Sequence, residues 1–379
     1  MTDRLLVLLT CLAFLATLSA TSAAWAQVPE ISAKTQAAGT SLTDEQRREI
    51  DTFVTFYAEK LAADVADAAA DATWQRAIIA ARDAVVRTYS QGAGSAFRMY
   101  FAESIAKDFV PAVLGASRPQ ALVNAAIAVS KIDHPSVAPG LERMVAHANP
   151  AVRYCGMAGY VTIRDELLRE EKSRTALLEM LAARAEAETS APVLVLGVGA
   201  ADLTGSQVGE AILRPIRPAA LEIIVTVLKS AQTLQLVRDN DTAAFRALAG
   251  AATAAGSMGE SYKNDDRVKP VLDALAAVLV NAGEAYWDFS GIDGDKPSRL
   301  EPAQAWRQLM GDCERAMRRL TGKTANAVSE AIRTRVRIPD ARAVKLAVNE
   351  WVGSEGMDGV LTPLGVATPK PLEATPKRP

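Results

Sequence analysis

The sequence has few of the side chains on which many catalytic sites depend. Histidine occurs only twice in 379 residues, at His134 and His147. Catalytic zinc sites usually draw two or three histidines together, and Ser–His chemistry requires a positioned histidine base. His134 falls in a predicted turn and His147 at a predicted helix end, where a partial positive charge is favourable. We therefore expect both histidines to cap helices.

An excess of charge of one sign is also missing. The chain carries 42 Lys and Arg against 44 Asp and Glu, which gives a formal net charge of −2. A near-neutral chain exerts no overall electrostatic attraction on nucleic acid or on anionic lipid. We therefore do not expect nucleic acid as a partner.

Cysteine is too scarce for a disulfide framework. Of the three cysteines, Cys11 lies in the apolar N-terminal segment, which leaves Cys155 and Cys313 in the rest of the chain. A chain of this length buries a core without disulfides. We expect two buried thiols, although the sequence leaves open whether they pair.

Long apolar runs are confined to the N-terminus. Arg4 precedes an apolar stretch, and Ala24-Trp25-Ala26 supplies a small-x-small pattern before Gln27. This layout is typical of a secretory signal peptide. It predicts cleavage after Ala26, a periplasmic or secreted protein, and no membrane span once residues 1–26 are removed. The alternative is an uncleaved anchor, because the uncharged run is long enough to cross a bilayer.

Alternation of Val, Ile and Thr at period two, the pattern of a half-buried strand, is nearly absent. Apolar residues recur instead at helical spacing, as at Ile50, Phe53 and Tyr57. Thr43 and Gln46 have the spacing of a capping box, in which each side chain satisfies the other's backbone N–H. The sequence therefore predicts an all-α protein.

Two segments of the chain repeat at an offset of 31 residues (119 to 150). The segments are residues 117–132 and residues 148–163. When they are aligned, Pro119 matches Pro150, and the small residues Ala125 and Ala128 match Gly156 and Gly159. A weaker copy at residues 190–203 follows at an offset of 42 residues (150 to 192). The unit is helix, turn, helix.

The residues at the start of the second copy have a physical explanation. The pattern is Asn149-Pro150-x-Val152-Arg153, followed by Gly156 and Gly159. Asparagine is a good N-cap, proline fits the first helical position, and glycine lets a neighbouring helix approach closely. We expect Arg153 near the seam between repeats, bonded to carbonyls or to an acid of the adjacent turn. The pattern resembles the second helix of a HEAT repeat, in the HEAT/armadillo-like α-solenoid class. The resemblance implies antiparallel helix pairs that act as a scaffold or binding surface, and it implies no reaction.

The chain divides by composition into five parts. After the signal peptide we expect a disordered linker over residues 27–40 and HEAT-like repeats over residues 41–203. Residues 204–353 form further repeats or a compact helical bundle, and residues 217–237 should form one apolar helix with Pro218 near its start. The Pro-rich end, residues 354–379, is expected to be disordered.

Three short motifs suggest chemistry but are incomplete. Gly197-x-Gly199 lacks the third glycine of a dinucleotide fingerprint, and residues 321–324 lack the first glycine of a phosphate loop. Ser104 and Lys107 have Ser-x-x-Lys spacing without the other elements of penicillin-recognising enzymes. We predict no cofactor site and no catalytic residue from them.

The acidic loop of residues 288–301 leaves a metal site open. Its oxygen ligands would suit calcium, although their order does not match an EF-hand and a solvated loop is the alternative. The acids are Asp288, Asp293, Asp295 and Glu301.

A basic cluster near the C-terminus leaves a docking patch open. Trp306 and Trp351 flank it in the sequence, so it would suit an acidic partner, whereas a solvated face is the commoner explanation. The arginines are Arg318, Arg319, Arg333, Arg335 and Arg337.

These observations favour an interaction scaffold of the cell envelope with a protein partner, and not an enzyme. Solenoids offer extended binding surfaces, and no complete catalytic set is present. The alternative is a helical hydrolase or lyase that acts on envelope polysaccharide with carboxylates as acid and base. Pairs such as Asp165-Glu166 are available for that chemistry.

Overall fold

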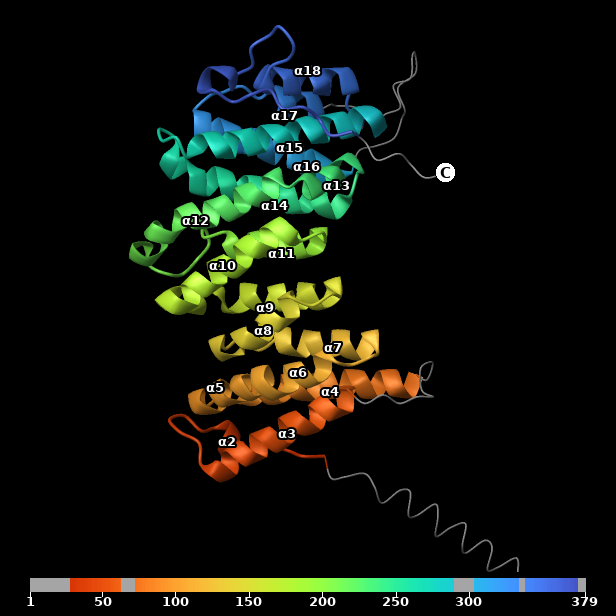
Figure 1. Ribbon diagram of the computed structural model, residues 1–379, viewed down its shortest axis with the longest axis vertical. Coiled ribbons are helices and arrows are strands. Elements are labelled where there is room, and N and C mark those ends of the chain that lie inside the picture. The colour runs from red at the N-terminus through yellow and green to blue at the C-terminus, as the bar shows by residue number, and fades with distance from the viewer. Residues whose placement is uncertain (1–27, 63–71, 290–302, 334–337, 374–379) are drawn as a thin grey trace, which may run out of the picture. The chain divides into compact units, whose positions relative to one another are not determined.

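The computed structural model describes residues 28–62, 72–289, 303–333 and 338–373. These residues form α-helices, one π-helical turn and short 3-10 turns, and their only β-type pairing is an isolated bridge between Ser354 and Met357. The all-α prediction is confirmed (Figure 1). None of the described helices combines the length and the apolarity that a membrane span needs. The predicted signal peptide, residues 1–26, lies outside the described residues.

The chain separates into two compact units, residues 1–125 and residues 126–379. The boundary falls within helix α7 (Pro119–Ser130). Residues on both sides of position 203 belong to the second unit, so the division expected there stays a prediction.

The first unit is built around an aromatic core. Phe101 lies 6.0 Å from Phe53 and 5.4 Å from Phe97, measured between ring centroids. The capping box at the start of α3 is confirmed, because Thr43 N–H donates to Gln46 Oε1 at 2.9 Å and Gln46 N–H donates to Thr43 Oγ1 at 3.3 Å. Its elements are α2 (Ala33–Gln36), α3 (Asp44–Ala62), α4 (Ala72–Gln91), α5 (Ser95–Ser104), the π-helix η1 (Ile105–Phe109) and α6 (Val110–Leu114).

The segment expected to be a disordered linker is packed over residues 28–40. Ile31 and Thr35 are buried, and the short helix α2 begins after the cap Ser32. The Glu49 carboxylate accepts hydrogen bonds from the Ser32 and Thr35 hydroxyls at 3.1 and 2.5 Å. The prediction of disorder was wrong here because a composition of small, polar residues does not reveal one buried apolar residue or two hydroxyl groups that bond to a distant acid.

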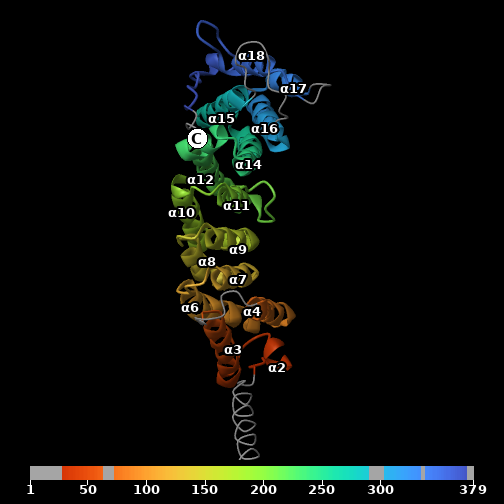
Figure 2. The ribbon, with the colours of Figure 1, turned by 90° about the vertical axis from the view of Figure 1, so that its right-hand side faces the viewer.

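The second unit stacks helices in two rows. Helix α9 packs on α8 and α11, α11 packs on α14, and α14 packs on α16, whereas α10, α12 and α15 pack on one another in sequence (Figure 2). The helices are α8 (Ala138–Val145), α9 (Pro150–Arg169), α10 (Glu171–Ala187), α11 (Ala191–Ala201), α12 (Glu210–Lys229), α13 (Ala231–Arg238), α14 (Thr242–Gly259), α15 (Val268–Phe289), α16 (Gln304–Thr321), α17 (Ala327–Ile332) and α18 (Ala341–Val352).

The contact between α8 and α9 shows why the sequence has glycine there. A Cβ atom on Gly156 would lie 2.9 Å from Met144 Cβ and 3.0 Å from the backbone nitrogen of Val145. Asn149 caps α9, since its Oδ1 accepts the Ala151 N–H at 2.9 Å. The predicted cap and the predicted close approach are both confirmed.

The C-terminal segment also differs from the expected disordered tail. Gly353 and Gly356, with φ of 82° and 79°, turn the chain back after α18, and Leu361 and Val366 are buried. Thr368 Oγ1 donates to the Val352 carbonyl at 2.9 Å. Widely spaced apolar residues anchor residues 354–373 although the segment is low in hydrophobic content overall.

Candidate functional site

The incomplete motifs fall on ordinary helical structure. Gly197 and Gly199 lie inside α11, with no strand before them in the described residues, and Thr321 ends α16 with Gly322 as a left-handed cap. Ser104 is buried, and its hydroxyl donates to Asp51 Oδ1 at 2.8 Å. None of these motifs contributes to a shared site.

Both histidines accept a backbone N–H through Nδ1. His134 Nδ1 accepts the Ser136 N–H at 3.2 Å, and His147 Nδ1 accepts the Asn149 N–H at 3.0 Å. The capping role is confirmed for His134, which is the N-cap of the 3-10 turn Pro135–Val137. His147 instead holds the turn between α8 and α9, because the N–H that it accepts belongs to Asn149, the cap residue of α9.

Arg153 lies at the seam between α9 and α11, as expected. Its guanidinium makes two hydrogen bonds to the Glu188 carboxylate, at 2.8 and 2.7 Å, and two to the carbonyls of His147 and Ala148, at 3.1 and 2.7 Å. Glu188 also accepts the N–H groups of Thr189 and Ser190. Burial raises the pKa of Glu188, but the guanidinium and these N–H groups outweigh it and hold the pKa below its ordinary value. The role is structural.

The acids Asp165 and Glu166 do not act together. Asp165 accepts hydrogen bonds from Arg164 Nε at 2.9 Å and from the Gln207 N–H at 2.8 Å, whereas Glu166 pairs with Arg169 at 2.7 Å. Each carboxylate is held by different partners. The arrangement gives no support to this pair as a general acid and base.

Of the four acids in residues 288–301 the structure describes only Asp288, which lies near the end of α15 and pairs with Arg238 at 2.5 Å. Asp293, Asp295 and Glu301 lie outside the described residues, so the calcium hypothesis stays a prediction. Within the described ranges no group of three His, Cys, Asp or Glu residues is placed to hold a metal ion.

The basic cluster does not form a patch flanked by tryptophans. Trp306 and Trp351 are 2% and 0% exposed, and their indole N–H groups donate to the Ala282 carbonyl and to Glu314. The flanking role predicted for them was wrong because both are core residues with a buried partner for the indole. Arg319 pairs with Glu260 at 3.7 Å, and Arg335 and Arg337 lie outside the described residues.

Cys155 and Cys313 are buried free thiols. Burial raises the pKa of Cys155 and of Cys313, which disfavours the reactive thiolate. The expectation of two buried thiols is confirmed, and the question of pairing is answered in favour of unpaired cysteines.

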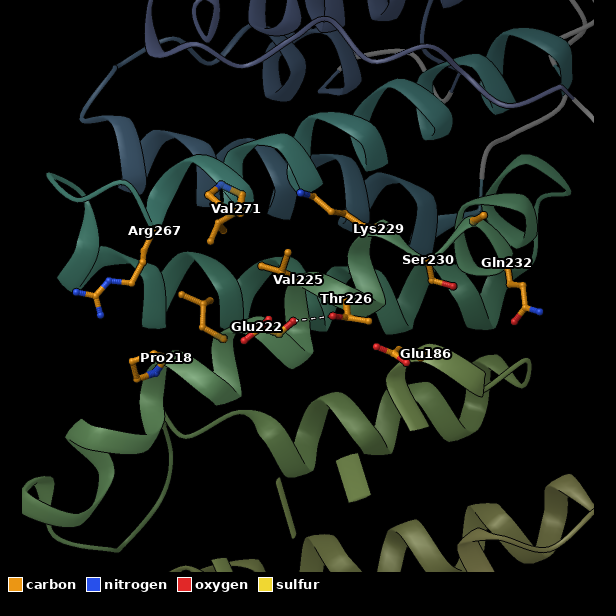
Figure 3. Close-up of a pocket in the computed structure, with 13 residues that line it drawn as sticks. Glu186, Pro218, Glu222, Val225, Thr226, Lys229, Ser230, Gln232, Arg267 and Val271 are labelled. Carbon is orange, nitrogen blue, oxygen red and sulfur yellow. Dashed lines mark hydrogen bonds between the residues drawn. The ribbon is translucent and has the colours of Figure 1, made fainter. Parts of the chain in front are cut away.

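A groove of about 700 Å³ opens in the row formed by α10, α12 and α15. Its floor is apolar, and Val225 of α12 and Val271 of α15 lie on facing sides of it (Figure 3). The lining residues are Glu186 of α10; Pro218, Leu221, Glu222, Val225, Thr226 and Lys229 of α12; Ser230, Ala231 and Gln232 at the start of α13; and Arg267, Pro270 and Val271 at the start of α15.

The helix break at Ser230 forms one end of this groove. The expected single helix over residues 217–237 is two helices, because Ser230 leaves the helical conformation (ψ 122°) and its Oγ accepts the Thr233 N–H at 3.4 Å. Helix α12 also begins earlier than expected, at Glu210, so Pro218 lies inside it. The prediction was wrong because the apolar spacing continues across the break and conceals it.

The groove has an uneven charge. Arg267 is already paired with Asp265 at 2.8 Å and stacks over Tyr262, 4.5 Å from the ring centroid. The carboxylates of Glu186 and Glu222 form no ion pair within the described part of the chain. With Lys229 as the one unpaired cation of the lining, the groove offers an excess of negative charge over an apolar floor.

Comparison with known proteins adds no identification. No protein-family model matches the chain, and no curated protein matches it.

Proposed function

We propose that this chain is an exported interaction scaffold of the cell envelope, and that the groove between α10, α12 and α15 binds a segment of a partner protein. The observation that carries the proposal is the apolar floor together with the free carboxylates of Glu186 and Glu222. Binding sites typically combine apolar lining with a few placed polar groups. The segment that fits is extended, with apolar or proline side chains for the floor and a lysine or arginine for the two acids.

The packing of the second unit supports a HEAT/armadillo-like assignment. Successive helices contact one another in two rows, and the seam at Gly156 has the cap, proline and glycine of the repeat pattern. Stacked helix pairs present extended surfaces on which partners dock. The proposal therefore assigns the chain a binding role and no reaction.

The extracytoplasmic location is proposed from residues 1–26 alone. N-terminal sequencing of the protein from fractionated cells tests it, and Gln27 is the expected first residue. An abundant soluble cytoplasmic form that begins at Met1 or Thr2 would contradict it.

Selection of peptides tests the groove. We would pan a displayed library of short random peptides on the mature chain and measure the affinity of the selected peptides by calorimetry. Enriched sequences should combine apolar residues with lysine or arginine, and Glu222→Lys should weaken their binding by about tenfold or more, since each tenfold step is about 1.4 kcal/mol.

A matched control separates this effect from a general change of charge. Glu179 is an exposed acid of α10 that lines a different surface depression, so Glu179→Lys makes the same charge change away from the groove. Equal affinity loss in both variants, or a library that yields no enriched peptide, would contradict the proposal.

A further inference from the structure

The C-terminal segment contacts both the start of helix α15 and Asn281, and residues 366–373 form no helix. A Cβ atom on Gly365 would lie 3.7 Å from Lys269 Nζ, and the Leu372 N–H donates to Asn281 Oδ1 at 2.9 Å. Lys269 and Asn281 are twelve residues apart (269 to 281), about 18 Å along a helix. The seven residue steps from 365 to 372 span at most about 25 Å when extended, which is enough to cover that distance.

Two side-chain amides hold the main chain of this segment. Asn281 accepts the Leu372 N–H, and Gln235 Nε2 of α13 donates to the carbonyl of Glu373 at 3.4 Å. Asn281 is 1% exposed, and its own Nδ2 is bonded to the Ala277 carbonyl at 2.8 Å, which fixes Oδ1 toward the segment. These contacts bind an N–H and a C=O, so they do not depend on the side chains of the bound segment.

Each amide lies on the same helix as a residue of the groove lining. Asn281 is eleven residues after Pro270 (270 to 281), which is three helical turns, so both lie on one face of α15. Gln235 is three residues after Gln232 (232 to 235) and is its neighbour on α13. A polypeptide segment that lies along these two faces would pass from the groove lining to the two amides.

We propose that Asn281 and Gln235 form a clamp for the main chain of an extended polypeptide, continuous with the groove, and that residues 368–373 are the chain's own occupant of that clamp. The clamp rests on the proposed binding function of the groove. A partner segment that extends past Gln232 has to displace the tail. The tail thereby lowers the affinity of the full chain for such partners.

Two properties of residues 368–373, their tether to the chain and their proline content, support them as the occupant of the clamp. A tethered segment acts at an effective concentration in the millimolar range, so a weak contact is enough to keep it bound. The segment is rich in proline, with Pro369 and Pro371 before Leu372, and proline favours the extended conformation that the clamp requires.

Removal of a single N–H tests the clamp in the full chain. Leu372→Pro deletes the donor to Asn281 and leaves Asn281 and Gln235 in place. The probe is a fluorescent peptide with the sequence of residues 366–379, measured by anisotropy. The Leu372→Pro chain should bind it at least about tenfold more tightly than the wild-type chain, whose clamp is occupied in cis.

Two modified peptides provide the control. N-methylation of the peptide at Leu372 should abolish binding to the Leu372→Pro chain. N-methylation at Lys370, whose N–H makes no hydrogen bond within the described residues, should leave binding within about twofold. Asn281→Leu in the Leu372→Pro chain should also abolish binding.

The outcomes separate the clamp from the groove. Equal affinity of wild-type and Leu372→Pro chains, or equal effects of the two methylations, would overturn the clamp and leave the groove untouched. Glu222→Lys can also be introduced into the Leu372→Pro chain. If this double variant no longer binds the library-selected peptides but still binds the tail peptide, the result supports both the groove and the clamp. No binding of the tail peptide to the Leu372→Pro chain at millimolar concentration would overturn the clamp alone.

Discussion

Arg153 and Glu188 form a buried ion pair that joins α9 to the start of α11, with the Arg153 Nη2 to Glu188 Oε1 distance at 2.7 Å and side chains 12% and 2% exposed. Each partner also satisfies backbone groups, the arginine two carbonyls and the carboxylate two N–H groups. The pair therefore fixes the geometry of the seam and not only its charge.

Removal of one partner should destabilise the second unit strongly. Glu188→Ala leaves Nε and Nη2 of a buried guanidinium and two backbone N–H groups without their acceptor, and breaking a buried pair in this way typically costs about 3–5 kcal/mol. Urea unfolding followed by circular dichroism measures the change. Glu166→Ala is the control, because its pair with Arg169 is exposed and such pairs are worth about 0–1 kcal/mol. A similar loss in both variants would contradict the structural role of the seam.

The same pair predicts a dependence of stability on pH. The pKa of Glu188 is lower in the folded protein than its ordinary value of 4.5, so its stabilisation is complete above that value. It is lost as the pH falls from there through the lower folded-state pKa, where the carboxyl takes up a proton. The urea midpoint of the wild type should therefore fall more steeply below pH 4.5 than that of Glu188→Gln. Parallel curves for the two proteins would contradict this account.

Two glycines inside helices should respond in opposite directions to alanine. Gly156→Ala places a Cβ 2.9 Å from Met144, which forces α8 and α9 apart, and overpacking typically costs about 1–3 kcal/mol. Gly250→Ala in α14 meets no atom within 4 Å and should stabilise by up to about 1 kcal/mol through helix propensity. Thermal melts decide the sign. A stabilised Gly156→Ala protein would contradict the close approach at the seam.

The expectation that Cys155 is a packing residue gives a further comparison. Cys155→Ser places a hydroxyl in a buried position without adding bulk, so it should destabilise less than Gly156→Leu in the same melts. A Cys155→Ser protein that loses its fold while Gly156→Leu stays stable would contradict the architectural interpretation of the segment.

Glu314 should be essential for the C-terminal helices. Its side chain is fully buried and accepts the N–H groups of Val328 and Ser329 at 2.8 and 2.7 Å and the indole N–H of Trp351 at 2.9 Å. Glu314→Ala leaves three donors without their acceptor, and the two that are buried, the Val328 N–H and the Trp351 indole N–H, cost about 1–3 kcal/mol each. Intrinsic tryptophan fluorescence should shift to longer wavelength as the indole is exposed, and an unchanged spectrum and melt would contradict the contacts.

The sequence predicted helices and their caps well because these are local properties. Apolar spacing and the pairs Thr43–Gln46 and Asn149–Ala151 involve neighbours in the chain, and the structure has them as expected. The arginine of the seam was also predicted, but Glu188 lies 35 residues from Arg153 and no spacing rule identifies it.

The groove was missed because its residues come from four separate helices, α10, α12, α13 and α15. Glu186, Val225 and Val271 are each ordinary for a helix surface, and only packing brings them together. The one local feature, Ser230, is a good cap, but it lies within an uninterrupted apolar pattern. The polar residues Ser230 and Gln232, on either side of Ala231, were the only local indication that the helix breaks there. The tail was misjudged for a related reason, because Asn281 and Leu372 are 91 residues apart.

Hydrogen–deuterium exchange with a library-selected peptide tests the central claim most directly, because it shows where on the chain a bound segment lies. With saturating peptide, the protected amides should cluster in residues 218–232 of α12 and α13 and in residues 267–271 at the start of α15, and Glu222→Lys should abolish that protection. Protection confined to α9, α11 and α14, or protection unchanged in Glu222→Lys, would contradict the assignment of the groove as the binding site.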